Sequence, residues 1–312
     1  MNKKHKSLTV SFITLFFLLN FLLHSEVMIK TFFDTTKLWF YNLFPSIFVF
    51  FIITDILNNY QFPYYLSNIF GKIISKIYHL PQETVYILFM AMTSGFPGNS
   101  KLIKEQLDRH VISLNDANKL LTMTHFSNPL FIIYTIGITF FRDKTLGLII
   151  LLIHFITNYL IGFLFRNIYQ ETPSFTKIFL NKPKPFIQTL TTSITNTLPI
   201  LFNVFGIVLF FSLFTKTINL YLNLNDFSNT LVNGLLEITN GLNLLSTLSI
   251  SKIKKATLAT FFISFGGFSI HAQIFTILHK YHLNYYLYLI ARILHASISS
   301  LLVFIISFLI YR

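Results

Sequence analysis

Apolar segments long enough to enter a membrane recur along nearly the whole of this 312-residue chain. Nine of them lie near residues 8–24, 38–57, 84–98, 120–140, 145–165, 187–214, 229–250, 257–278 and 285–311. Only 11% of the residues are charged, against about 25% in soluble domains. The pattern therefore predicts an all-α polytopic protein of the cell membrane, with the lipid bilayer as a partner.

The basic charge and the absence of cysteine narrow the functional classes. The formal net charge is +13, but the Lys and Arg residues are spread over short loops between apolar segments. A topology bias explains that distribution better than a nucleic-acid-binding face, so we expect no nucleic-acid partner. The chain has no cysteine, which excludes disulfides, thiolate metal sites and cysteine nucleophiles.

The N-terminus resembles a secretory signal. Lys3, Lys4 and Lys6 precede an apolar run over residues 8–23. No small-residue cleavage motif follows, because residues 24–26 read His-Ser-Glu. This favours an uncleaved anchor over a cleaved signal peptide, with the N-terminus in the cytoplasm.

Two segments are interrupted in a way that suggests re-entrant hairpins. If 84–112 and 229–251 return to the side they entered from, 14 Lys and Arg residues lie inside and 9 outside, leaving out Arg292. Nine full crossings from an inside N-terminus reverse that ratio. Nine crossings from an outside N-terminus give the same count as the hairpin model, 14 inside and 9 outside. The charge count therefore leaves both topologies open. The broken sequences favour the hairpins.

The two halves of the chain share an order of elements. Each has a Pro-led apolar span, a hairpin, an interrupted span and a closing span, with the hairpins predicted on opposite sides. We therefore predict two inverted repeats, each with a re-entrant hairpin and a broken transmembrane helix. The expected parts are an N-terminal anchor helix and loop (1–37), a first repeat (38–166), a cytoplasmic linker (167–186) and a second repeat (187–312).

An amphipathic helix is predicted between the first span and the first hairpin. Over residues 64–79, Ile and Leu side chains follow the helical period while Lys72 and Lys76 share the opposite face. We expect this helix to lie flat on the cytoplasmic surface; packing inside the bundle is the alternative.

Glu237 is the last acidic residue of the chain and lies in an apolar segment. A carboxylate at membrane depth is costly and usually faces a protein interior or a water-filled cavity. Residues 239–241, Thr-Asn-Gly, break the segment directly after it. We expect Glu237 to bind a substrate donor or carry a coupling proton; the alternative is an ion pair with Arg292. Asp55, near the end of its span, is expected at the membrane interface.

Three further motifs break apolar segments. SGFPGNSK (94–101) combines two glycines with a proline, so a helix must end there and another begin near Asn99 or Ser100. That new N-terminus would suit an anionic group, or the motif is a packed hairpin tip without a ligand. HFSNPLF (125–131) and SFGGFSIHAQ (264–273) are interrupted similarly. Their polar side chains either satisfy freed backbone groups or contact substrate.

The predicted substrate-binding residues come from these four motifs. They are Gly95, Gly98, Asn99, Ser100, Ser127, Asn128, Glu237, Thr239, Asn240, Gly267, Ser269, His271 and Gln273. His271 is either a protonation switch or a hydrogen-bonding residue of the packed interior. No metal-ligand pair, phosphate-binding loop or serine–histidine arrangement with an orienting third group is present, so we expect neither an enzyme nor a cofactor.

The four motifs in this order resemble those of the nucleoside-recognition Gate domain proteins, and within them the YlbJ sporulation integral membrane proteins. SGFPGNSK is similar to the family's SGYPMGAK-like tip, and SNPLF, EITNGL and SFGGFSIHAQ are similar to its other signatures. The resemblance covers roughly residues 38–311.

The resemblance implies the fold of concentrative nucleoside transporters, in which hairpin tips and broken helices hold the substrate. A hairpin glutamate corresponds to Glu237, and polar residues of the next broken helix correspond loosely to Ser269 and His271. True nucleoside transporters carry a glutamine–threonine–glutamate signature in the first hairpin, where this chain has residues 96–99, Phe-Pro-Gly-Asn. The loss of one acid, with Lys101 at the rim, favours an anionic substrate.

These features predict a secondary transporter for a small polar or anionic metabolite. The family's link to late spore development makes the aromatic diacid dipicolinate a candidate beside nucleosides. We expect coupling to H⁺ or Na⁺, and the related transporters imply a homo-oligomer, a trimer. The alternative function is a non-transporting membrane scaffold for spore or envelope assembly, which would recruit partners through the loop 166–186.

Overall fold

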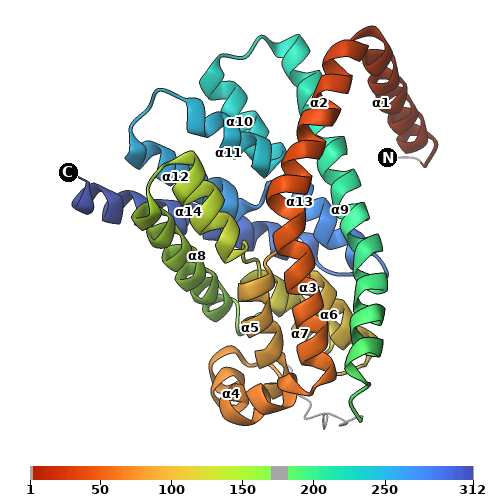
Figure 1. Ribbon diagram of the computed structural model, residues 1–312, viewed down its shortest axis with the longest axis vertical. Helices are drawn as coiled ribbons and strands as arrows, with labels where there is room; N and C mark the ends of the chain where they lie inside the picture. The colour runs from red at the N-terminus through yellow and green to blue at the C-terminus, as the bar shows by residue number, and fades with distance from the viewer. Residues whose placement is uncertain (1–2, 170–181, 312) are drawn as a thin grey trace.

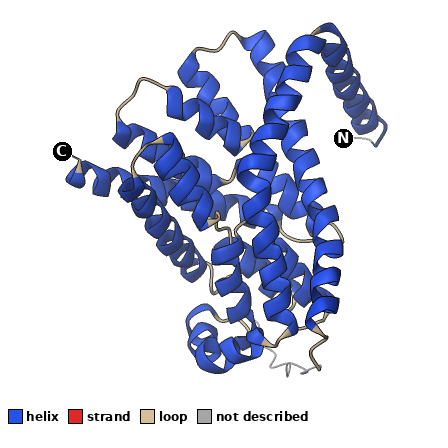
Figure 2. Cartoon of the chain, in the orientation of Figure 1, coloured by secondary structure: helices blue, strands red, loops and turns tan. Residues whose placement is uncertain are grey.

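The computed structural model describes residues 3–169 and 182–311. Over these ranges the chain forms helices and loops and contains no strand (Figure 2). A helix satisfies its own backbone hydrogen bonds, which is what a segment in lipid requires. The prediction of an all-α protein is confirmed.

The N-terminal region is a bent helix followed by a long helical column. Its elements are α1 (Lys3–Leu23), α2 (Ser25–Leu38), the π-helical η1 (Trp39–Leu43) and α3 (Phe44–Asn59). The chain turns by 98° between α1 and α2 and then continues without a loop through α3 (Figure 1). The π-helical stretch precedes Pro45, whose missing N–H disturbs the regular helical ladder. The expected boundary at residues 37 and 38 falls inside this column.

The next elements form the lower part of the molecule as drawn in Figure 1 and the start of its centre. They are α4 (Phe62–Tyr78), the 3₁₀ turn η2 (Gln82–Thr84), α5 (Val85–Ser94), α6 (Gly98–Asp108), α7 (Leu114–Met123), the π-helical η3 (Phe131–Phe140) and α8 (Lys144–Leu164). The predicted amphipathic helix is α4. Leu66 on one of its faces is buried, while Ile69 and Ile73 are 65% and 56% exposed.

The second half begins with the longest helix. Its elements are α9 (Phe186–Leu222), α10 (Asp226–Leu236), α11 (Ile238–Thr247), α12 (Lys252–Phe265), α13 (Gly267–Ile277) and α14 (Tyr285–Ile310). The 37 residues of α9 extend over roughly 55 Å at 1.5 Å per residue. This exceeds the hydrocarbon thickness of a bilayer, about 30 Å.

Four stretches of the described chain are long and apolar enough to cross a membrane, or five if the bent N-terminal pair is one span. They are α8, α9, α12 with α13, and α14. Three of the other predicted apolar segments are short or split: residues 84–98 mostly form the short helix α5, and residues 120–140 and 229–250 each form two short elements. The chain is therefore a multi-pass membrane protein with several helices too short to span.

The two short helix pairs approach the centre from opposite ends. Figure 1 shows α5 and α6 in the lower half and α10 and α11 in the upper half. Between them α12 packs along α14, and α14 packs along α8. One hydrophobic cluster extends from α5 and α7 through α8 to α12 and α14, which fixes the positions of the helix breaks at the centre.

Candidate functional site

The two helix pairs and both breaks converge on a small inner pocket. Its volume is about 40 Å³, close to the share of liquid volume of a single water molecule. The polar residues that line it are Ser127, Asn128, Glu237, Thr239 and Gln273. All five belong to the set predicted from the sequence, and they come from three of the four motifs. The inner pocket is thus where the predicted residues meet.

Glu237 lies at the junction of α10 and α11 and is 1% exposed. Its carboxylate accepts hydrogen bonds from the Asn240 backbone N–H at 2.8 Å and from Thr239 Oγ1 at 3.2 Å. It therefore caps the N-terminus of α11, where the helix dipole stabilises negative charge. No ion pair of Glu237 occurs among the described residues, so the alternative pairing with Arg292 is not what the structure contains.

The first break is built around Gly95 and Asn128. Gly95 has a φ of 70°, and a Cβ there would lie 2.6 Å from the Asn128 backbone nitrogen. Asn128 accepts from the Leu130 N–H at 2.8 Å and donates to the Thr93 carbonyl at 3.3 Å. Its amide thus satisfies backbone groups that the break leaves open. Ser127 Oγ is buried and lacks a partner within the described ranges.

The second break touches the first. Gly266 and Gly267 both have positive φ, and a Cβ on Gly266 would lie 2.4 Å from Nε2 of His125 in the first break. Only a glycine allows this close approach of the two interrupted helices. His271 is tied to the break, because its Nε2 lies 2.9 Å from the Phe265 carbonyl oxygen.

Eight of the predicted residues do not line the inner pocket. They are Gly95, Gly98, Asn99, Ser100, Asn240, Gly267, Ser269 and His271. Several already have local partners: Ser100 Oγ donates to the Pro97 carbonyl at 2.6 Å, and Asn240 Nδ2 donates to Ser212 Oγ at 2.9 Å. The hydroxyl of Ser269 is buried without a partner in the part of the chain that is described.

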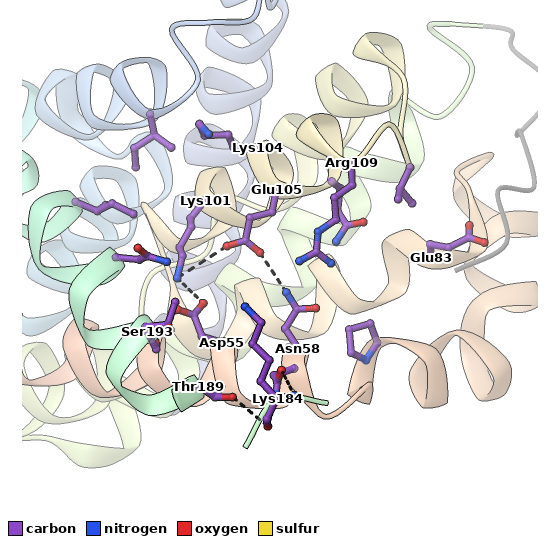
Figure 3. Close-up of a pocket in the computed structure, with 18 of the residues that line it drawn as sticks. Asp55, Asn58, Glu83, Lys101, Lys104, Glu105, Arg109, Lys184, Thr189 and Ser193 are labelled. Carbon is purple, nitrogen blue, oxygen red and sulfur yellow. Dashed lines mark hydrogen bonds and ion pairs between the residues drawn. The ribbon is translucent and has the colours of Figure 1, made fainter. Parts of the chain in front are cut away.

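A second, larger cavity of about 950 Å³ opens between α3, α6 and α9 (Figure 3). We call it the vestibule. Val204 and Gln273 line both the vestibule and the inner pocket. These two side chains therefore lie at the boundary between the two spaces, which we call the neck.

An ion cluster lies on the wall of the vestibule. Lys101 Nζ lies 2.5 Å from Asp55 Oδ1 and 4.0 Å from Glu105 Oε1. Ser193 of α9 donates to Asp55 Oδ2 at 2.7 Å, and Asn58 donates to Glu105 at 3.3 Å (Figure 3). Burial raises the pKa of Glu105, and the Lys101 ammonium opposes that shift. The cluster joins α3, α6 and α9.

The structure places Asp55 in this ion cluster, and its position at the membrane interface stays a prediction. Its side chain is 17% exposed and pairs with Lys101, which was expected only at the rim of the site. The i,i+4 spacing of Lys101 and Glu105 was a visible signal of a charged helix face. Asp55, the partner of Lys101, lies 46 residues earlier in the chain, and no local pattern identifies it.

Buried polar side chains of α8 and α14 form a layer next to the helix breaks. Arg292 of α14 is fully buried and donates to the Thr122 carbonyl and, at 3.0 Å, to His295 Nδ1. His154 of α8 accepts from the Ser127 N–H at 3.0 Å and contacts Ser264 Oγ at 2.9 Å. Ser127 belongs to the first break and Ser264 directly precedes the second, so His154 links the two.

The comparisons with known proteins support a family. The chain is 25% identical over 304 residues to the sporulation integral membrane protein YlbJ of Bacillus subtilis strain 168. The match covers 86% of this chain and 74% of the relative. The chain is a homologue of YlbJ, which supports its place in the YlbJ-like family. No family model matches the chain, and no solved structure matches it.

Proposed function

We propose that this YlbJ-like protein is a secondary transporter for a small polar or anionic metabolite. In this proposal α5 with α6, and α10 with α11, are re-entrant hairpins of two inverted repeats. Substrate binds between their tips at the inner pocket. The substrate class includes nucleoside-like molecules and small aromatic carboxylates such as dipicolinate, and the name of the relative suggests a role in sporulation.

The observation that carries the proposal is the convergence at the inner pocket. Ser127 and Asn128 come from one break and Gln273 follows the other. Glu237 lies between α10 and α11, and Thr239 belongs to the first turn of α11. A pocket built where interrupted helices meet at depth is how transporters hold polar solutes. Its volume of about 40 Å³ suits a closed site that must widen to admit substrate.

Ligand-dependent thermal stability of the purified protein tests this. The panel contains nucleosides, dipicolinate and other small carboxylates, each applied to the wild type and to Glu237→Gln. A ligand at 100 times its dissociation constant stabilises by about 2.7 kcal/mol. We expect one chemical class to raise the Tm of the wild type and to lose that effect in the variant.

A matched control separates site loss from a general charge effect. Asp226→Asn removes a carboxylate from the same helix pair, at the start of α10, and Asp226 does not line the inner pocket. This variant should keep the ligand response. If no ligand stabilises the wild type, or Glu237→Gln responds like it, the transporter proposal fails and a scaffold without a substrate becomes the better account.

A further inference from the structure

The helix α9 has one polar face and one apolar face. Thr189, Ser193, Asn196 and Asn203 line the vestibule, and their spacing places them on one side of a helix. Phe202 is next to Asn203 in sequence, is 57% exposed and does not line the cavity. One face of α9 therefore borders the vestibule while the other presents large apolar side chains to its surroundings.

Asn203 shows that the polar face faces water. It lies in a helix whose apolar window has a mean hydropathy of 2.2, roughly 25 Å along the helix from its start at 1.5 Å per residue. Its side chain is exposed, and the described residues offer it no hydrogen-bond partner. An amide in hydrocarbon without a partner costs several kcal/mol. A water-filled vestibule removes that cost.

The charges around the vestibule favour an anion. Five Lys and Arg side chains line it against three Asp and Glu side chains. Lys101 is committed to Asp55, and Lys104 pairs with Asp108 at 2.6 Å. Arg109 and Lys184 take part in none of the ion pairs found among residues 3–169 and 182–311. Figure 3 draws both among the residues that surround the cavity.

We infer that the vestibule is an anion-binding entrance for a small carboxylate ligand, with Arg109 as its main binding group. The guanidinium fork of Arg109 matches a carboxylate in two parallel hydrogen bonds, and the hydroxyl and amide groups of α9 solvate the ligand along the wall. The neck at Val204 and Gln273 then gives access to the inner pocket. The transport step rests on the proposed function, whereas the anion site does not.

Single cysteines test whether the vestibule is wet, because the natural chain has none. Asn203→Cys and Phe202→Cys are reconstituted separately and treated with membrane-impermeant methanethiosulfonates. Thiolates react in water and not in lipid, so we expect Asn203→Cys to react at least tenfold faster than its neighbour. Equal rates at the two positions, or no reaction at Asn203→Cys, would overturn the inference.

The sign of the electrostatic potential in the vestibule is measured at Asn196→Cys. Rates with an anionic and a cationic methanethiosulfonate are each divided by the rate with a small free thiol. A fixed cation speeds the reaction of the anionic reagent and slows that of the cationic one, because the two reagents interact with it with opposite sign. We expect a ratio above 1 that Arg109→Gln lowers severalfold and that high salt also lowers.

Lys144→Gln is the charge-matched control, because Lys144 is exposed and lies outside the vestibule. It should leave the ratio unchanged. A ratio at or below 1 in the wild-type background, or the same fall with Lys144→Gln, would contradict an anion-selective vestibule.

Ligand binding is tested by protection with dipicolinate as the probe. It should slow labelling of Asn203→Cys in a saturable way, and Arg109→Gln should abolish that protection. If Asn203→Cys is labelled but never protected, the anion site is wrong although the vestibule is wet. Protection that survives Glu237→Gln while transport is lost separates this inference from the proposed function.

Discussion

Two buried charged residues, Glu237 and Arg292, have hydrogen-bond partners other than each other, although Arg292 Nε has none among the described residues. Glu237 accepts from the first turn of α11, and Arg292 donates to a backbone carbonyl and to His295. Burying a charge without an ion-pair partner costs free energy. We therefore expect each of these two side chains to have a role that its surroundings indicate. The carboxylate of Glu237 borders the inner pocket, whereas Arg292 borders neither cavity. The proposed binding role therefore belongs to Glu237, and we expect Arg292 to support the fold.

Arg292→Gln should destabilise the protein strongly. The change leaves the Thr122 carbonyl and Asn158 without their donor, at about 1–3 kcal/mol for each buried group. Thermal unfolding in detergent measures this, with Lys72→Gln on the exposed face of α4 as control. A Tm equal to that of the control would show that the buried polar layer does not depend on the guanidinium.

Asp108 gives a pH-dependent contact at the surface. It accepts hydrogen bonds from Lys104, Lys280 and the Tyr281 hydroxyl, and these hold the pKa of its carboxyl well below the usual value. A depressed pKa in the folded state contributes stability above the unfolded value, about 3.9, and loses it as the pH falls further. Solvent exposure of 32% limits the size of the effect.

Asp108→Asn should therefore lower the Tm at pH 7, and the difference from wild type should shrink as the pH falls from 4 to 3. Scans of Tm against pH for the two proteins measure this. A constant difference over the whole range would mean that Asp108 stabilises through packing rather than through charge.

At the scale of elements, the helix breaks determine the site. Each break combines a positive-φ glycine with a close approach: Gly95 against Asn128, and Gly266 against His125. The sequence predicts these breaks because glycine and proline act locally, and it predicts Glu237 because an acid in an apolar segment is visible without any partner. It does not predict that Arg292 bonds His295 and Thr122, because those contacts depend on how α14 packs.

Gly266→Ala should disrupt the crossing of the two breaks. A methyl group there would lie 2.4 Å from His125 Nε2, and a φ of 91° strains any residue with a Cβ. We expect a large loss of folded protein. Gly206→Ala in α9 is the control, since a Cβ at Gly206 has nothing within 4 Å and alanine favours the helix. Similar yields and Tm values for both variants would contradict the account.

At the scale of the whole molecule, two cavities of different size share a neck. The vestibule of about 950 Å³ and the inner pocket of about 40 Å³ meet at Val204 and Gln273. The broad class and several inner-pocket residues were predictable from local sequence patterns. The vestibule was not, because its wall combines α3, α6 and α9, and Asp55 and Ser193 are 138 residues apart. The loop 166–186, offered for a scaffold, lies largely outside the described residues.

The most direct test of the central claim is solute uptake by proteoliposomes. Wild type, Glu237→Gln and Asp226→Asn are reconstituted at equal protein content, and uptake of labelled dipicolinate and of a labelled nucleoside is followed against empty liposomes. We predict uptake of one solute class by the wild type and by Asp226→Asn, and background uptake by Glu237→Gln. Equal uptake by Glu237→Gln and the wild type would contradict the role of the inner pocket, and background uptake by all three would contradict transport of these solutes.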